Sequence, residues 1–147
     1  MFVQIAFGSA LMLLSILITG VSFWFMEMFM LRYRPWLART PHRPKITLIF
    51  CLTAVWILLQ VSAGVWIWAV ALWSLEIFAT LELSVYFSLV AFTTLGFGDV
   101  LLPEEWRLLS VMAAANGLLN FGLLTALLVE VMRQVRASQV DSLRGHK

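Results

Sequence analysis

The sequence predicts an all-α membrane protein with three transmembrane helices and one shorter, re-entrant helix. The chain of 147 residues is 62% hydrophobic and only 12% charged, whereas globular domains are about half apolar and a quarter charged. Three apolar runs, within residues 2–26, 46–73 and 106–132, are long enough to cross a bilayer, which needs about 20 residues. A fourth run, 81–92, is too short to span and is followed by two closely spaced glycines.

The first apolar run, residues 2–26, carries no charged side chain. A cleaved signal peptide has basic residues before an apolar core of about 7 to 15 residues. Here the apolar run is longer, and the basic residues follow it. Residues 1–31 are therefore predicted to form a retained N-terminal transmembrane helix.

Residues 32–45 concentrate positive charge and proline, which indicates a short, stiff loop, because proline disfavours helix at the preceding residue. Their Lys, Arg and Pro residues are Arg32, Arg34, Pro35, Arg39, Pro41, Arg43, Pro44 and Lys45. Short basic loops stay in the cytoplasm, where they contact anionic lipid head groups. This rule places the N-terminus outside and the tail, residues 136–147, in the cytoplasm.

The second and third apolar runs enclose the short one. Residues 46–73 are predicted to span the membrane, and Trp66, Trp68 and Trp73 near their outer end are typical of an interfacial aromatic belt. Thr80 suits the N-cap of a helix over 81–92. If that helix is re-entrant, the partial negative charge at its C-terminus favours a cation near the membrane centre.

The stretch Thr93-Thr94-Leu95-Gly96-Phe97-Gly98-Asp99 follows this short helix. Irregular backbone survives at membrane depth only where protein buries it or where it lines a watery path. Gly96 and Gly98 can adopt a positive φ, which lets successive carbonyl groups point to one side. Such a row of carbonyl oxygens replaces the water around a cation.

Residues 94–99 resemble the signature of the potassium channel pore family, Thr-Val-Gly-Tyr/Phe-Gly-Asp. Residues 81–92 are placed like the pore helix of that family and 106–132 like its inner helix, in which 120–127 resemble small bacterial two-transmembrane-type channels. The resemblance covers about residues 46–135, so the N-terminal helix is additional. It implies a pore domain over 46–135 in a potassium-selective channel of the bacterial inner membrane.

The resemblance also implies a homotetramer with K⁺ ions in a selectivity filter on its axis. The ion-binding residues would be Thr94, Leu95, Gly96, Phe97 and Gly98, through backbone carbonyls and the Thr94 hydroxyl. Their side chains would point away from the ion and pack against the pore helix. Leu95 and Phe97 replace the more common Val and Tyr, which leaves the degree of selectivity open.

Further residues around the filter carry expected roles. Asp99, Glu104 and Glu105 would ring the outer mouth, although a solvated turn explains the two glutamates equally well. Tyr86, Val90 and Thr93 would support the filter. Val90 stands where some bacterial members of the family carry a glutamate that pairs with the filter aspartate, so we expect Tyr86 to serve Asp99 instead.

Residues of the third run are expected to form the cavity or gate: Asn116, Gly117, Asn120, Phe121 and Thr125. Amides at membrane depth should face a cavity or a neighbouring helix. Gly117 falls where the family often has a hinge glycine, and close helix packing explains it equally well.

Two other functions remain open: a weakly selective cation channel with the same architecture, and a non-conducting accessory membrane subunit. An enzyme is not expected, since no nucleophile, base and orienting group come together. His42 and His146 are isolated, and the lone Cys51 is predicted to be a packed core thiol. We expect no cofactor besides K⁺, and lipids but no nucleic acid as partners.

Overall fold

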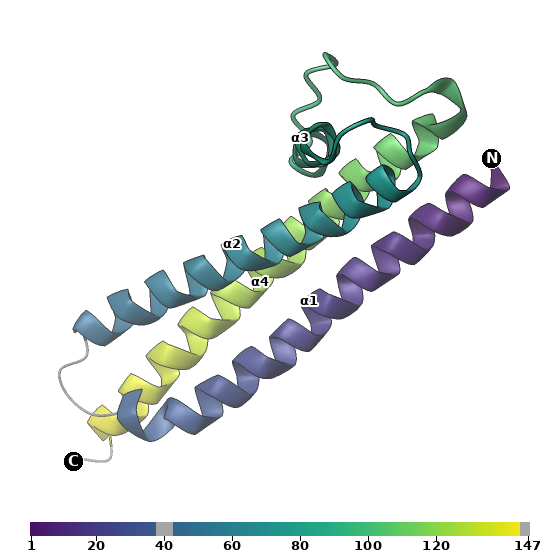
Figure 1. Ribbon diagram of the computed structural model, residues 1–147. Helices are drawn as coiled ribbons and strands as arrows, with labels where there is room; N and C mark the ends of the chain where they lie inside the picture. Colours follow the sequence, from purple (N-terminus) through teal and green to yellow (C-terminus); the bar gives the residue numbers. More distant parts are fainter. Residues whose placement is uncertain (38–42, 145–147) are drawn as a thin grey trace.

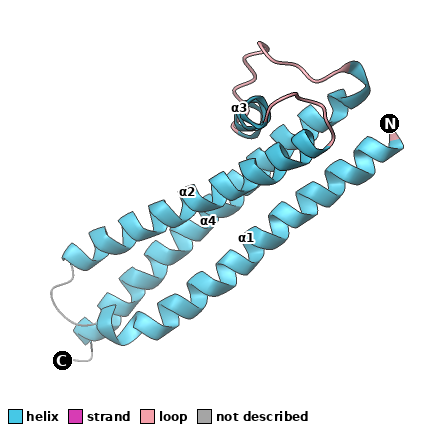
Figure 2. Cartoon of the chain, in the orientation of Figure 1, coloured by secondary structure: helices cyan, strands magenta, loops and turns pink. Residues whose placement is uncertain are grey.

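The computed structural model describes residues 1–37 and 43–144, and this part of the chain is helical apart from short connections (Figure 1). The helices are α1 (Phe2–Leu37), α2 (Arg43–Ser74), α3 (Leu81–Phe92) and α4 (Arg107–Arg144), with a 3-10 turn, η1 (Glu104–Trp106), before α4. No strand occurs among the described residues (Figure 2). The predicted all-α membrane fold is confirmed.

Three of these helices are long and apolar enough to cross a membrane: Phe2–Tyr33, Pro44–Ser74 and Glu104–Ala137. They lie side by side, and α1 packs along α4 more extensively than along α2. The short α3 packs against α2 and α4 at one end of the bundle, which is also where the N-terminus lies (Figure 1). The C-terminal end of α1 and the start of α2 lie at the opposite end, where α4 also ends (Figure 1).

The first helix is longer than the sequence predicts. It passes the expected boundary at residue 31 and continues through Pro35 to Leu37, so the first part of the basic segment is helical and not a loop. A proline inside a helix removes one hydrogen bond and clashes with the preceding turn, at a cost of about 3 kcal/mol, yet α1 continues for two residues beyond Pro35. Because α2 begins at Arg43, only 38–42 of the expected loop remain, and these lie outside the described residues.

The last helix is also longer, since α4 continues beyond residue 132 to Arg144. Extending an existing helix adds one hydrogen bond for each residue that becomes fixed, and 133–144 contain neither Gly nor Pro. Most of the expected tail is therefore helix, and residues 145–147 lie outside the described part of the chain.

Two buried clusters hold the long helices together. One lies at the α3 end and contains Trp68, Leu72, Phe92 and Leu109, and the other contains Met30, Ile49, Leu124, Leu127, Val131 and Val135. Trp68 is fully buried, whereas Trp66 and Trp73 are about half exposed. The aromatic-belt interpretation was therefore wrong for Trp68, which faces the protein. It was also wrong to expect Cys51 in the core, because its side chain is exposed.

Candidate functional site

The short helix α3 begins with a side-chain cap and ends at the candidate site. Thr80 has extended backbone, and its hydroxyl accepts a hydrogen bond from the Leu83 amide at 3.2 Å, which confirms the expected N-cap. Buried residues of α3, among them Ser84, Phe87 and Phe92, fix it against the bundle. A capped, half-buried helix is a rigid support for the loop that follows it.

The C-terminus of α3 folds into a Schellman motif. The Leu95 amide donates to the Val90 carbonyl at 3.1 Å, and the Thr94 amide donates to the Ala91 carbonyl at 2.9 Å. This motif needs a left-handed residue just after the cap, and Thr94 has φ +59° there. A β-branched residue rarely adopts this conformation, so strain is concentrated where the loop begins.

The backbone of the loop alternates in handedness. Thr94, Gly96 and Gly98 have positive φ values of 59°, 58° and 75°, while Leu95 and Phe97 between them do not. Alternation between left-handed and right-handed residues turns successive peptide groups toward the same side, whereas a regular strand alternates them. These φ values are compatible with a row of like-directed carbonyl groups.

The side chains of the loop lie differently from the prediction. Leu95 and Phe97 are 60% and 65% exposed in the single chain, so they are not packed against α3 of their own chain. Loop and helix are instead joined by backbone hydrogen bonds and by the Thr93 hydroxyl, which donates to the Leu89 carbonyl at 2.7 Å. Val90 contributes through its carbonyl, the acceptor for Leu95.

Asp99 at the far end of the loop is tied back to the middle of α3. The Tyr86 hydroxyl donates to the Asp99 carboxylate at 2.5 Å, the hydrogen bond that the sequence led us to expect. This hydrogen bond holds the pKa of Asp99 below its ordinary value of 3.8, because the donor stabilises the charged form; backbone donors assist, and partial desolvation opposes the shift. The loop is therefore anchored at both ends to α3.

The two glutamates of the turn before α4 lie in η1 and are exposed. Glu104 forms an ion pair with Arg107 at 3.1 Å, and both side chains are largely exposed. An exposed pair of this kind adds little stability, but it offsets the charge of Glu104. Of the three carboxylates predicted at the outer mouth, Asp99 and Glu105 form no ion pair with a described residue.

Helix α4 approaches the foot of the loop at a glycine. A Cβ atom on Gly117 would lie 1.9 Å from the Phe92 carbonyl oxygen, so no other residue fits there without displacing backbone. Of the two explanations for Gly117, the contact favours close packing. One and two turns further along α4, Phe121 and Thr125 are exposed, and the ring centroids of Phe121 and Phe92 lie 6.1 Å apart.

The two asparagines of α4 lie elsewhere. Asn116 and Asn120 are 0% and 3% exposed, and Asn120 faces α1 instead of the exposed face that carries Thr125. Of the two predicted surroundings, a cavity or a neighbouring helix, the structure contains the second. The partners of Asn120 are Ser15 and Thr19, which the sequence analysis did not single out, and Asn116 accepts a hydrogen bond from Asn120.

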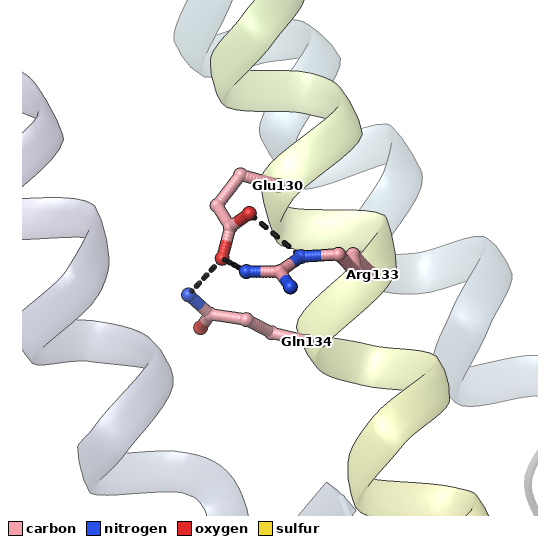
Figure 3. Close-up of polar contacts among 3 residues, drawn as sticks. All are labelled: Glu130, Arg133 and Gln134. Atoms are coloured by element: carbon pink, nitrogen blue, oxygen red, sulfur yellow. Dashed lines mark hydrogen bonds and ion pairs between the residues drawn. The ribbon is translucent and has the colours of Figure 1, made fainter.

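The opposite end of α4 carries a polar cluster, formed by Glu130, Arg133 and Gln134 (Figure 3). Arg133 donates to both carboxylate oxygens of Glu130 at 2.9 Å, and Gln134 donates to the same carboxylate at 2.9 Å. A cavity of about 290 Å³ between α1 and α4 reaches this cluster. No group of side chains suited to a metal ion occurs among the residues that the structure describes.

Comparison with known families agrees with this geometry. A family model described as an ion channel matches residues 46–134, which comprise α3, its loop and most of α2 and α4 but not α1. The match is consistent with the resemblance to the potassium channel pore family. No curated protein and no solved structure matches the chain. Since the family model covers more than half of the 147 residues, the chain belongs to this family of ion channels.

Proposed function

We propose that the protein is a potassium-selective channel in which residues 94–98 of four copies form the ion-binding filter. The observation that carries the proposal is the alternation of positive and negative φ from Thr94 to Gly98. It allows the carbonyl groups of successive residues to face one axis, where they replace the water shell of a K⁺ ion. The Thr94 hydroxyl lies at the inner entrance of this row.

Assembly is part of the proposal because one chain supplies only one side of an ion site. Carbonyls from identical copies around a rotation axis close the ring, and the resemblance of the loop implies four copies. The exposure of Leu95 and Phe97 supports assembly, since a neighbouring copy would cover these large apolar side chains.

The orientation of the protein in the membrane follows from the distribution of its basic residues. The end of α1 and the start of α2, which carry Arg32, Arg34, Arg43 and Lys45, lie at the same end of the bundle as the basic last turns of α4, opposite the loop (Figure 1). The positive-inside rule assigns that end to the cytoplasm. The proposed channel then has its N-terminus and its filter mouth outside, with Asp99 and Glu105 attracting cations, in a bacterial inner membrane.

Flux through purified protein in liposomes tests this function. We expect K⁺ flux down a gradient, blocked by Ba²⁺, and little Na⁺ flux. Equal K⁺ and Na⁺ flux would replace the proposal with a weakly selective cation channel. The absence of either flux from an intact assembly would point to an accessory subunit.

A pair of glycine substitutions links flux to the loop. Gly96→Ala places a Cβ on a left-handed residue, which costs about 1–2 kcal/mol in the conformation the filter needs. We expect K⁺ flux to fall about 5- to 30-fold, the factors that correspond to about 1 and 2 kcal/mol. Gly20→Ala in α1 meets no atom within 4 Å and has helical backbone, so this variant should conduct like the natural protein.

A further inference from the structure

Helix α1, which lies outside the matched family region, buries a polar stripe. Ser15, Thr19 and Ser22 are only 2–3% exposed, whereas Leu13 and Leu17 on the same helix are 61% and 64% exposed. The spacing of four and three residues puts the three hydroxyl groups on one face. In a bilayer, where apolar surface gains nothing by leaving lipid, such polar contacts and close packing hold helices together.

Two of these hydroxyl groups, those of Ser15 and Thr19, form hydrogen bonds with Asn120 of α4. Thr19 Oγ1 donates to Asn120 Oδ1 at 2.7 Å, and Asn120 Nδ2 donates to Ser15 Oγ at 3.2 Å. Asn120 Nδ2 also lies 3.0 Å from Asn116 Oδ1. We call Ser15, Thr19, Asn116 and Asn120 the α1–α4 clamp; each of the four side chains is at most 3% exposed.

The clamp lies beside the contact between α4 and the foot of the loop. Asn116 and Asn120 flank Gly117, whose backbone touches the Phe92 carbonyl at the end of α3. The same turn of α4 is therefore held by α3 on one side and by α1 on the other. Rotation of α4 about its axis would separate Asn120 from Thr19 and Gly117 from Phe92 together.

A second polar contact anchors α1 to the rest of the bundle. Trp56 Nε1 of α2 donates to Ser22 Oγ at 2.6 Å. Next to it, an apolar cavity of about 410 Å³ lies between α1 and α2, and Phe25, Phe29 and Leu52 help to line it. The hydrogen bond between Ser22 and Trp56 holds α1 against α2. From this fixed position, α1 can hold α4 in place through the clamp.

We propose that Ser15 and Thr19 are positioning residues for ion conduction. They hold Asn120, and through it they fix the rotation of α4 at which Gly117 supports the foot of the filter and Phe121 and Thr125 stay on the exposed face. The proposal rests on the function proposed above, in that it requires a conducting channel. It assigns to α1 a role in the pore although α1 supplies no residue to it.

The test compares variants that differ in one hydroxyl or amide group. Thr19→Val removes the donor at nearly constant volume, and Thr19→Ser keeps it. A coupling between α1 and the pore of ordinary size changes activity about fivefold or more. We expect K⁺ flux in liposomes to fall by this factor in Thr19→Val and to stay within about twofold of the natural protein in Thr19→Ser. Val21→Thr, the reverse change at an exposed site of α1, should leave flux unchanged.

A double-mutant cycle separates positioning from general damage. If Thr19 acts through Asn120, flux in Thr19→Val with Asn120→Leu should equal that of the more impaired single variant, since both remove the same contact. The K⁺ to Na⁺ flux ratio should stay unchanged, and size-exclusion chromatography should show an intact assembly.

Three results would overturn the proposal: natural flux in intact Thr19→Val, effects that multiply in the double variant, or loss of selectivity in the single variants. Natural protein without any flux would instead refute the proposed function, so the two failures are distinguishable.

Discussion

Residue Thr94 combines two roles in one backbone conformation. Its φ of +59° completes the Schellman motif at the end of α3 and begins the alternation that continues at Gly96 and Gly98. A β-branched residue pays a steric cost here, and the two hydrogen bonds at Thr94 and Leu95 offset it. The strain thus lies at the point where helix becomes loop.

The hydrogen bond between Tyr86 and Asp99 gives a prediction for the stability of the conducting state. Tyr86→Phe removes the donor while keeping the ring, so the far end of the loop loses its tie to α3. We expect macroscopic K⁺ current to decay faster than in the natural protein. Unchanged decay in Tyr86→Phe would show that this hydrogen bond does not hold the loop.

The same hydrogen bond predicts a pH dependence. The pKa of Asp99 is lower in the folded protein than its ordinary 3.8 because Tyr86 stabilises the carboxylate. A depressed pKa means that the contribution is fully present above the ordinary pKa and is lost as pH falls through the folded pKa. Current decay should therefore be independent of external pH from neutral down to about 4 and should accelerate below it. In Tyr86→Phe this acceleration should be smaller.

Gly117 provides a prediction about packing. Gly117→Ala would place a methyl group against the Phe92 carbonyl, a backbone atom that cannot move aside cheaply. We expect a loss of about 1–3 kcal/mol, typical of overpacking, measured as a lower thermal transition of the purified protein. Gly122→Ala is the matched control, since no atom lies within 4 Å of its added Cβ; equal destabilisation of both variants would contradict the packing role.

At the scale of elements, α3 depends on its N-cap. Thr80→Ala leaves the Leu83 amide without its side-chain acceptor, and such a change costs about 1 kcal/mol. Because α3 carries the loop, the variant should melt at a lower temperature, followed by circular dichroism. Thr80→Ser retains the hydroxyl and should restore most of the difference. If Thr80→Ala melts like the natural protein, the cap does not contribute to stability.

Helices α1 and α4 show how far local patterns determine an element. Apolar composition identifies both as spanning helices. The predicted ends, residues 31 and 132, were too early, because charged residues and one proline favoured loops there. Helix propagation extends α1 to Leu37 and α4 to Arg144. Charged residues indicate where a helix leaves the lipid, but they do not by themselves end the helix.

At the scale of the whole molecule, the exposed loop side chains predict assembly. Phe97 is 65% exposed in one chain, so Phe97→Ala should hardly change the stability of that chain. If a neighbouring copy covers the ring, the variant should dissociate into single chains at a lower temperature, as measured by native mass spectrometry on heating. Leu17→Ala, at an exposed site of α1, is the control. Identical dissociation of Phe97→Ala and the natural protein would argue against this interface.

The sequence by itself determined the membrane class, the three spanning segments, the short helix with its Thr80 cap and the glycines of the loop, because apolar runs, capping and glycine conformation are local properties. The surroundings of Trp68, Asn116 and Asn120 could not be predicted in this way. Which neighbour each side chain contacts depends on how the helices are rotated relative to one another. Only the tertiary structure decided that Asn120 of α4 bonds to α1 and that Gly117 packs on Phe92. Helix rotation is set by contacts between residues far apart in the chain, and no local pattern contains that information.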